Sequence, residues 1–218
     1  MPVCFDKVAI AYGVLEKALF GSSLQLMRCR YLNQIEDSKE ILLVGEGCGF
    51  FLKKLLEVNA EAMITVVEPS ENMIKQAESR VPHKDRKRVV FCNAAFGQFV
   101  PEGTFDVACT FFFWDCFREN QTKALLPRLL NCLEPDGLLI NADFVEPSSS
   151  SGRRFKISHF ILLRILYGFF GFATGIESTR VFEIEPVALG NGFIAKDTYM
   201  HEKLPFKGQV FQRRFVKR

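Results

Sequence analysis

The sequence contains no group of cysteines and histidines spaced like the ligands of a metal site. Its seven cysteines include no C-x-x-C pair and have no regular spacing, and the three histidines, His83, His159 and His201, lie far apart. A structural zinc site or an iron–sulfur cluster needs several Cys or His ligands at short intervals. We therefore expect no metal, and we interpret the cysteines as reduced thiols of a cytoplasmic protein.

Long apolar runs are also absent. Asp6 and Lys7 fall where a signal peptide needs an uninterrupted apolar core. The most apolar stretch, residues 156–176, contains His159 and Arg164, and its uncharged part is about 12 residues long, whereas a spanning helix needs about 20. These features predict neither export nor a membrane span. They leave open a peripheral contact of this stretch with a membrane surface.

The charge is nearly balanced. The net charge is +3, and the basic residues are spread along the chain apart from two short runs at 83–88 and 213–218. Such runs are typical of solvated surface segments, so no nucleic-acid partner is expected. With 48% hydrophobic residues, the chain has enough apolar side chains for the core of one globular domain.

Strand-like and helical patterns alternate along the middle of the chain. The apolar runs typical of strands are residues 40–45, 63–68, 89–93, 105–112 and 137–145. Helical spacing lies between the first two runs and again after Glu71 and Glu119, which predicts an α/β fold with a doubly wound, mostly parallel sheet. Two further strands within 197–217 complete seven strands as an antiparallel pair, and two helices within 5–35 precede the sheet. The segment "LEPDG" (133–137) is interpreted as a turn before the fifth strand.

The first predicted strand runs into three alternating glycines, Gly45, Gly47 and Gly49. In a parallel sheet, ligands lie beyond the carboxyl ends of the strands, and glycines there let the backbone approach them closely. The dinucleotide fingerprint has a third glycine where this chain has Phe50, which disfavours a dinucleotide. Glu68 ends the next strand and is placed to accept hydrogen bonds from ribose hydroxyls, so we predict a nucleoside-containing cofactor. A glycine turn without a ligand is the simpler alternative.

These motifs resemble those of the class I S-adenosylmethionine-dependent methyltransferases. The matching segments are "LLVGEGCG" (42–49), "VVEPSENMI" (66–74), "FCNAAF" (91–96) and "LEPDGLLI" (133–140), and the resemblance extends from about residue 5 to the end. More narrowly, the chain is similar to uncharacterised bacterial methyltransferases distantly related to quinone C-methyltransferases. The segments that carry this narrower similarity are 5–21, 111–117 and 162–180. The resemblance implies the Rossmann-like methyltransferase fold and methyl transfer to a small molecule.

The resemblance also implies S-adenosylmethionine as the cofactor and names the residues that contact it. The methionine part is expected on the glycine motif, at Gly45, Glu46, Gly47, Cys48 and Gly49. The ribose is expected on Glu68, and the adenine beside Pro69, Ser70, Met73, Asn93, Ala94 and Ala95. Thr110 and Phe111, at the end of the fourth strand, complete the expected set. Leu43 departs from the pattern, because the family usually has at this position an acid that helps to position the methionine ammonium.

The resemblance divides the single domain into four parts. They are a helical cap (1–38), a cofactor-binding core (39–146), an apolar helical region for substrate or lid (147–196) and a closing strand pair (197–218). The segment "TFFFWDCF" (110–117) occupies the place where methyltransferases meet their acceptor. It lacks the Asp/Asn-Pro-Pro-aromatic motif of enzymes that methylate base amino groups, and its aromatics favour a small hydrophobic acceptor.

Three residues are candidates for catalysis: Asp115, Tyr12 and His159. Methyl transfer needs a base only if the acceptor must lose a proton. Each candidate also has a structural interpretation, as a helix cap for Asp115 and as packing for the other two, and Asp143 is either a site acid or a loop anchor. Two alternatives to the enzyme stay open, an S-adenosylmethionine-binding protein without turnover and a nicotinamide-dependent oxidoreductase. The second is disfavoured by Phe50 and by the lack of a Tyr-x-x-x-Lys motif.

Overall fold

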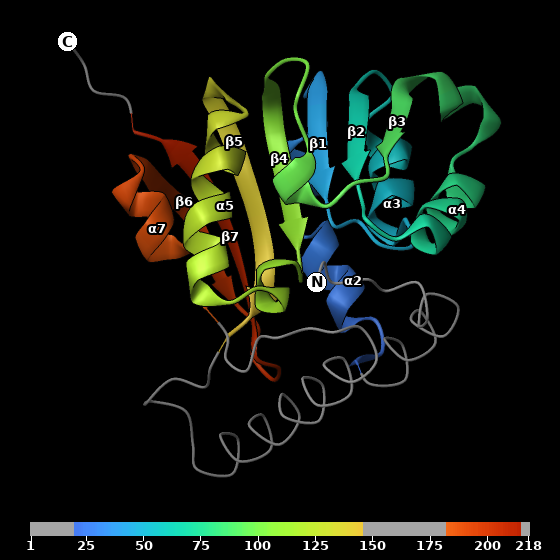
Figure 1. Ribbon diagram of the computed structural model, residues 1–218. Helices are drawn as coiled ribbons and strands as arrows, with labels where there is room; N and C mark the ends of the chain where they lie inside the picture. The colour runs from blue at the N-terminus through green and yellow to red at the C-terminus, as the bar shows by residue number, and fades with distance from the viewer. Residues whose placement is uncertain (1–19, 146–181, 215–218) are drawn as a thin grey trace.

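A seven-stranded sheet forms the centre of the computed structural model, which describes residues 20–145 and 182–214 (Figure 1). The strand order is β3-β2-β1-β4-β5-β7-β6. The strands are β1 (Glu40–Val44), β2 (Met63–Val67), β3 (Val89–Cys92), β4 (Phe105–Phe111), β5 (Leu133–Phe144), β6 (Phe193–Met200) and β7 (Phe206–Arg213). The first five pair in parallel, whereas β7 pairs antiparallel with β5 and β6. The predicted fold class is confirmed.

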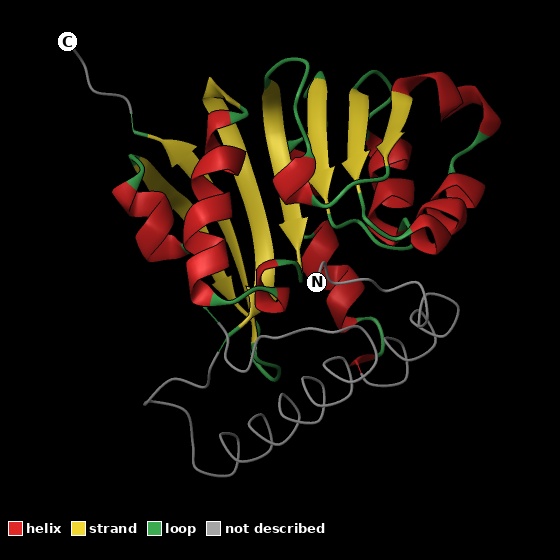
Figure 2. Cartoon of the chain, viewed as in Figure 1, coloured by secondary structure: helices red, strands yellow, loops and turns green. Residues whose placement is uncertain are grey.

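Helices cover both faces of this sheet (Figure 2). The α-helices are α2 (Ser23–Cys29), α3 (Phe50–Val58), α4 (Glu71–Arg80), α5 (Glu119–Asn131) and α7 (Glu185–Gly190). Four short 3-10 helices are η1 (Leu32–Gln34), η2 (His83–Arg88), η3 (Phe96–Gln98) and η4 (Trp114–Cys116). Of the two helices predicted within 5–35, the second corresponds to α2, and the first lies largely outside the described residues.

The apolar run of β1 is explained by burial on two sides. Ile41 and Leu43 belong to the core cluster that contains residues of α2 and α3, whereas Leu42 and Val44 belong to the cluster that contains residues of α5 and α7. All four side chains are at most 2% exposed. A central parallel strand therefore reads as continuously hydrophobic, because helices cover both of its faces.

The prediction of a turn at 133–137 is wrong, because β5 already begins at Leu133. Leu133 pairs with Phe105, and a register shift follows before Leu138 pairs with Val107. A Cβ at Gly137 would lie 3.0 Å from the carbonyl oxygen of Phe105, so glycine permits this close approach of two backbones. The glycine that suggested a turn therefore serves an irregular strand pairing.

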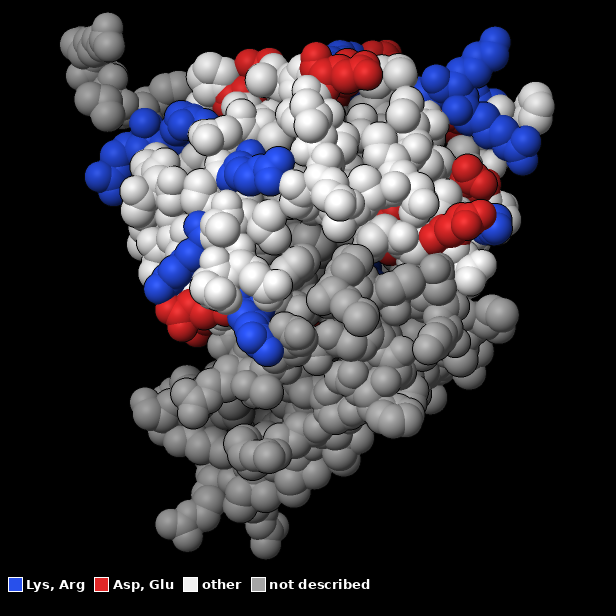
Figure 3. Space-filling view, viewed as in Figure 1, with Lys and Arg blue, Asp and Glu red and all other residues white. Residues whose placement is uncertain are grey.

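The surface carries its charges in separate groups. On the face shown in Figure 3, Lys and Arg side chains of the described residues lie in several clusters with neutral surface between them. Within residues 20–145 and 182–214, no helix is both long and apolar enough to cross a membrane.

Candidate functional site

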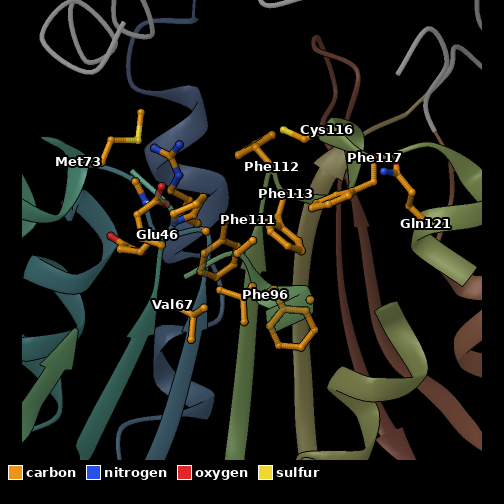
Figure 4. Close-up of a pocket in the computed structure, with 18 residues that line it drawn as sticks. Glu46, Val67, Met73, Phe96, Phe111, Phe112, Phe113, Cys116, Phe117 and Gln121 are labelled. Atoms are coloured by element: carbon orange, nitrogen blue, oxygen red, sulfur yellow. The ribbon is translucent and has the colours of Figure 1, made fainter. Parts of the chain in front are cut away.

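A cavity of about 150 Å³, open to solvent, lies at the carboxyl ends of β1, β2 and β4. Its walls combine the glycine loop after β1, the loop after β2, the start of η3 and the segment after β4. In Figure 4, Glu46 and Met73 lie on one side of the cavity, and Phe113, Phe117 and Gln121 lie on the other. The position is the one expected for a ligand of an open parallel sheet.

The glycine loop forms the floor of this cavity because two of its residues need to be glycine. Gly45 has φ +69°, and a Cβ there would lie 2.6 Å from Cδ2 of Phe113. Gly47 has φ +67°, with only Met73 Sδ, at 3.7 Å, close to where a Cβ would be. Side chains at these positions would strain the backbone and fill space that a ligand can use.

Gly49 serves helix packing instead. It has φ +84° and precedes α3, and a Cβ there would lie 2.6 Å from Cα of Ala77 on α4. Gly49 and its neighbour Cys48, which is 2% exposed, do not line the cavity. Their place in the motif is explained by the contact between α3 and α4.

Glu46 sits between the cavity and the start of α3. Its Oε1 accepts hydrogen bonds from the backbone N–H groups of Phe51 at 3.0 Å and Leu52 at 2.9 Å. These are donors that the first turn of a helix leaves unpaired, so the carboxylate acts as a cap. Burial nevertheless raises the pKa of Glu46 to about 7, although the two backbone bonds and the charge of Arg28 act in the opposite direction.

Glu68 joins the loops after β1 and β2. Its Oε2 accepts a hydrogen bond from the N–H of Gly47 at 3.1 Å, and its Oε1 accepts one from the N–H of Ser70 at 3.0 Å. The side chain is 3% exposed and lines the cavity. These two bonds tie the glycine loop to the loop after β2, with the Glu68 carboxylate in the cavity wall.

The residues predicted beside the adenine divide into two groups. Pro69, Met73 and Ala95 line the cavity. Ser70 is fully buried, and its hydroxyl caps α4 by accepting from the N–H of Met73. Asn93 donates from Nδ2 to the carbonyls of Glu68 and Pro69, at 3.2 and 3.0 Å, so it supports the loop after β2 from outside the cavity. The N–H of Ala94 is used in a bond to the carbonyl of Cys92.

Aromatic rings form the opposite wall. The Phe113 ring lies 4.8 Å from the ring of Phe117 and 4.9 Å from that of Trp114, and its edge meets Phe96 at 6.5 Å. Phe112 adopts φ +53°, unusual for a bulky residue, and its N–H donates to the carbonyl of Ala142 at 2.7 Å. The backbone bend at Phe112 places Phe111, Phe112 and Phe113 all on the cavity.

A pair of buried acids lies behind this wall. Asp143 accepts from the N–H groups of Trp114 and Asp115 at Oδ2, at 3.0 and 3.3 Å, and from its neighbour Phe144 at Oδ1. Burial raises the pKa of Asp115 to about 6 and raises that of Asp143 well above its ordinary value, where the negative charge of Asp115 adds to the effect. Cys116, which lines the cavity, donates a weak bond from Sγ to Asp115 at 3.6 Å.

The structure places the remaining candidates away from the cavity or outside the described residues. Thr110 is fully buried; its hydroxyl donates to Asn141 at 2.9 Å and accepts from Nε1 of Trp114 at 3.1 Å, so it has a structural role. Asp115 does not itself line the cavity. Tyr12 and His159 lie outside the described residues.

Sequence reasoning missed one charged lining residue, Arg28 of α2, which is 8% exposed. It falls at helical spacing among the buried Leu24, Met27 and Tyr31. The signal that could have identified Arg28 is a cation on the buried side of an amphipathic helix, because a buried charge needs a partner. The other lining residues that were not individually predicted are Val44, Val67, Phe96, Gly97, Phe112, Phe113, Cys116, Phe117 and Gln121.

Comparisons with known proteins agree with this fold. Residues 41–137 match the family model of a methyltransferase domain. An O-methyltransferase family protein from Burkholderia thailandensis superposes with a TM-score of 0.72 at 11% identity, over 96% of this chain and 60% of that one. Magnesium protoporphyrin IX methyltransferase from Synechocystis PCC 6803, solved with bound SAH, gives a TM-score of 0.70 at 13% identity, over 96% of both chains.

The mitomycin 7-O-methyltransferase MmcR gives a TM-score of 0.69 at 14% identity and is matched over 57% of its length by 94% of this chain. The chain spans about three fifths of the length of MmcR and of three other solved O-methyltransferase-like structures that it resembles. No curated protein matches it by sequence.

Proposed function

We propose that this chain, whose residues 41–137 form a methyltransferase domain with the class I fold, transfers the methyl group of S-adenosylmethionine to a small, mainly apolar acceptor. The observation that carries the proposal is a single cavity that combines a glycine floor, the buried Glu68 and an aromatic wall. The residues present fit the cofactor, because the glycine at position 47 lets a ligand approach the loop backbone beside Met73, and the Glu68 carboxylate lies where it can accept from ribose hydroxyls.

The chain's own residues contribute mainly by positioning. S-adenosylmethionine brings a methyl group that is already activated, so the protein has to hold the acceptor in line with it. Gly45 and Gly47 let the loop approach closely, while Phe113 and Phe117 bound the space on the other side. Rings on this wall exclude water and favour an acceptor with apolar surface.

Catalysis by a dedicated base is not part of the proposal. The acids nearest to the aromatic wall, Asp115 and Asp143, do not line the cavity. An acceptor that already carries a lone pair, or that loses its proton readily, needs no base for methyl transfer. The acceptor chemistry is therefore best found with a panel of phenols, quinones and carboxylic acids, by following the transfer of labelled methyl groups.

Binding of S-adenosylhomocysteine (SAH) and of NAD, measured in parallel by thermal shift, tests the proposal. A ligand that binds only the folded protein stabilises it by about 2.7 kcal/mol at a concentration of 100 Kd, so SAH should raise Tm and NAD should not. Glu68→Gln should lower SAH affinity, whereas Glu61→Gln, at an exposed position before β2, should leave it unchanged. Stabilisation by NAD alone would support an oxidoreductase, and SAH binding without transfer to any acceptor would support a protein without turnover.

A further inference from the structure

The segment after β4 and the start of α5 contribute three rings and two polar side chains, Cys116 and Gln121, to the cavity wall. In Figure 4, Gln121 lies with Phe117 on the side opposite Glu46 and Met73. Rings exclude water but orient an apolar molecule only weakly. In a mainly apolar site, the few polar groups decide which functional group of a ligand is accepted.

The thiol of Cys116 already uses its proton within the protein. Its Sγ donates weakly to Oδ1 of Asp115 at 3.6 Å. Burial, together with the negative charges of Asp115 and Asp143, raises the pKa of Cys116 well above its ordinary value, so the thiol stays neutral. The indole Nε1 of Trp114, the other donor of this segment, is bonded to Thr110. Neither group is placed to orient a ligand.

Gln121 has one end of its amide fixed by the helix that carries it. It is the third residue of α5, and its Oε1 accepts from the backbone N–H of Arg118 at 2.8 Å. This bond belongs to a capping box and satisfies a donor at the start of the helix. An amide turned the other way would place N–H against N–H, so the oxygen faces Arg118 and the nitrogen faces away from it.

The other end of this amide is a donor. Nε2 carries two N–H groups, and within residues 20–145 and 182–214 no protein group accepts a hydrogen bond from them. Gln121 is exposed and lines the cavity, so these two donors are open to a ligand there. Because the amide oxygen faces Arg118, Gln121 offers a ligand donors rather than an acceptor.

We propose that Gln121 selects the methyl acceptor by donating from Nε2 to an oxygen on an otherwise apolar molecule. This inference rests on the proposed function and names its substrate class, a ring compound that carries a carbonyl or hydroxyl oxygen. Phe113 and Phe117 bound the same part of the cavity and supply apolar surface for the ring. A compound with an ammonium group in this place would set N–H against N–H and is rejected.

Gln121→Glu removes the donors and keeps the helix cap. Glutamate has nearly the same shape as glutamine, and its carboxylate can still accept from the N–H of Arg118, as glutamate does at this position of a capping box. The variant should therefore unfold at the same temperature as the wild type. What changes at the cavity is that a carboxylate oxygen replaces the two N–H groups.

Three small probes test which functional group the cavity accepts. Acetophenone carries a carbonyl oxygen, α-methylstyrene has the same shape with a CH₂ group in place of that oxygen, and 1-phenylethylamine carries an ammonium group at neutral pH. Binding of each probe to the SAH-saturated full chain is measured by ligand-observed NMR. The ratio of acetophenone affinity to α-methylstyrene affinity should fall about 3- to 10-fold in Gln121→Glu, the range of one neutral hydrogen bond, and 1-phenylethylamine should bind more tightly.

Two further variants separate the loss of the donors from the added charge. Gln98→Glu is the matched control, because Gln98 lies in η3, is exposed and does not line the cavity. It brings the same charge and should leave the affinity ratio unchanged. Gln121→Met is neutral and of similar length, and it should lower the ratio as Gln121→Glu does, without tighter binding of 1-phenylethylamine.

The outcomes separate the inference from the proposed function. An unchanged ratio in Gln121→Glu and Gln121→Met would overturn the inference, because Gln121 would then serve only to cap α5. Equal weakening of all three probes, together with a lowered unfolding temperature, would overturn it as well. A wild-type chain that binds SAH but none of the probes would refute the inference alone, and one that does not bind SAH would refute the proposed function with it.

Discussion

Replacing Glu46 by Gln should change how the stability of the protein depends on pH. Glu46 is held at a pKa of about 7 in the folded chain, against about 4.5 for an ordinary glutamate. The folded protein therefore binds this proton more tightly than the unfolded chain does. The associated stability is fully present below pH 4.5 and is lost as pH rises through 7.

The magnitude follows from the size of the shift. A difference of about 2.5 pKa units at about 1.4 kcal/mol each corresponds to about 3 kcal/mol of unfolding free energy lost by the wild type between pH 4.5 and pH 8. Gln has no proton to lose, and its side-chain oxygen can still accept from the N–H groups of Phe51 and Leu52. Glu46→Gln should thus gain about 3 kcal/mol relative to the wild type over this range.

Urea denaturation at half-unit steps of pH measures this difference, with Trp114 as the probe. This is the only tryptophan of the chain and is fully buried, so its emission should shift to the red on unfolding. Glu57→Gln, at an exposed position on α3, the helix whose first turn Glu46 caps, is the control and should run parallel to the wild type. A Glu46→Gln curve that also runs parallel to the wild type would refute the assignment of the raised pKa to Glu46.

Three further substitutions test other parts of the structure. Gly45→Ala should lower SAH affinity at least tenfold and the free energy of unfolding by about 1–3 kcal/mol, because the added Cβ would lie 2.6 Å from Phe113. Gly103→Ala, where the added Cβ would have no atom within 4 Å, is the control for both the titration and the denaturation. Asn59→Ala should cost about 2–4 kcal/mol in urea denaturation, since this buried side chain pairs with four backbone groups between η1 and β2, and a loss under 1 kcal/mol would contradict that role. Trp114→Phe should cost about 1–2 kcal/mol by circular dichroism, because it removes the donor to Thr110, and Thr110→Val in the same background should then cost less than it does alone.

The sheet was predictable because its signal is local. Each of the first four strands is a short apolar run between loops, and the glycines after β1 predict a strand-to-helix turn. The start of β5 was missed because "LEPDG" contains the residues that usually make a turn. Only the tertiary approach of Gly137 to the backbone of Phe105 shows why they lie in a strand.

The site was predictable in part. Gly45, Gly47 and Glu68 could be placed from the motif because they follow strands that end at the same edge of the sheet. Ser70, Asn93 and Thr110 sit at similar positions in sequence, yet their polar atoms are used within the protein. Sequence position alone does not tell on which side of a loop a polar side chain points.

The two buried acids behind the aromatic wall also show that the position of a polar residue in the sequence does not establish its role. An aspartate among aromatics, such as Asp115, reads in the sequence as a candidate base because apolar surroundings raise its pKa. In the structure its partner Asp143 accepts three backbone N–H groups, from Trp114, Asp115 and Phe144, and so holds η4 against the end of β5. Holding η4 there fixes the segment on which Phe113 and Phe117 bound the cavity. The raised pKa of the pair is thus accounted for by its burial as an anchor of the wall. The methyl transfer that we propose depends on alignment, which such a wall can supply, more than on proton abstraction.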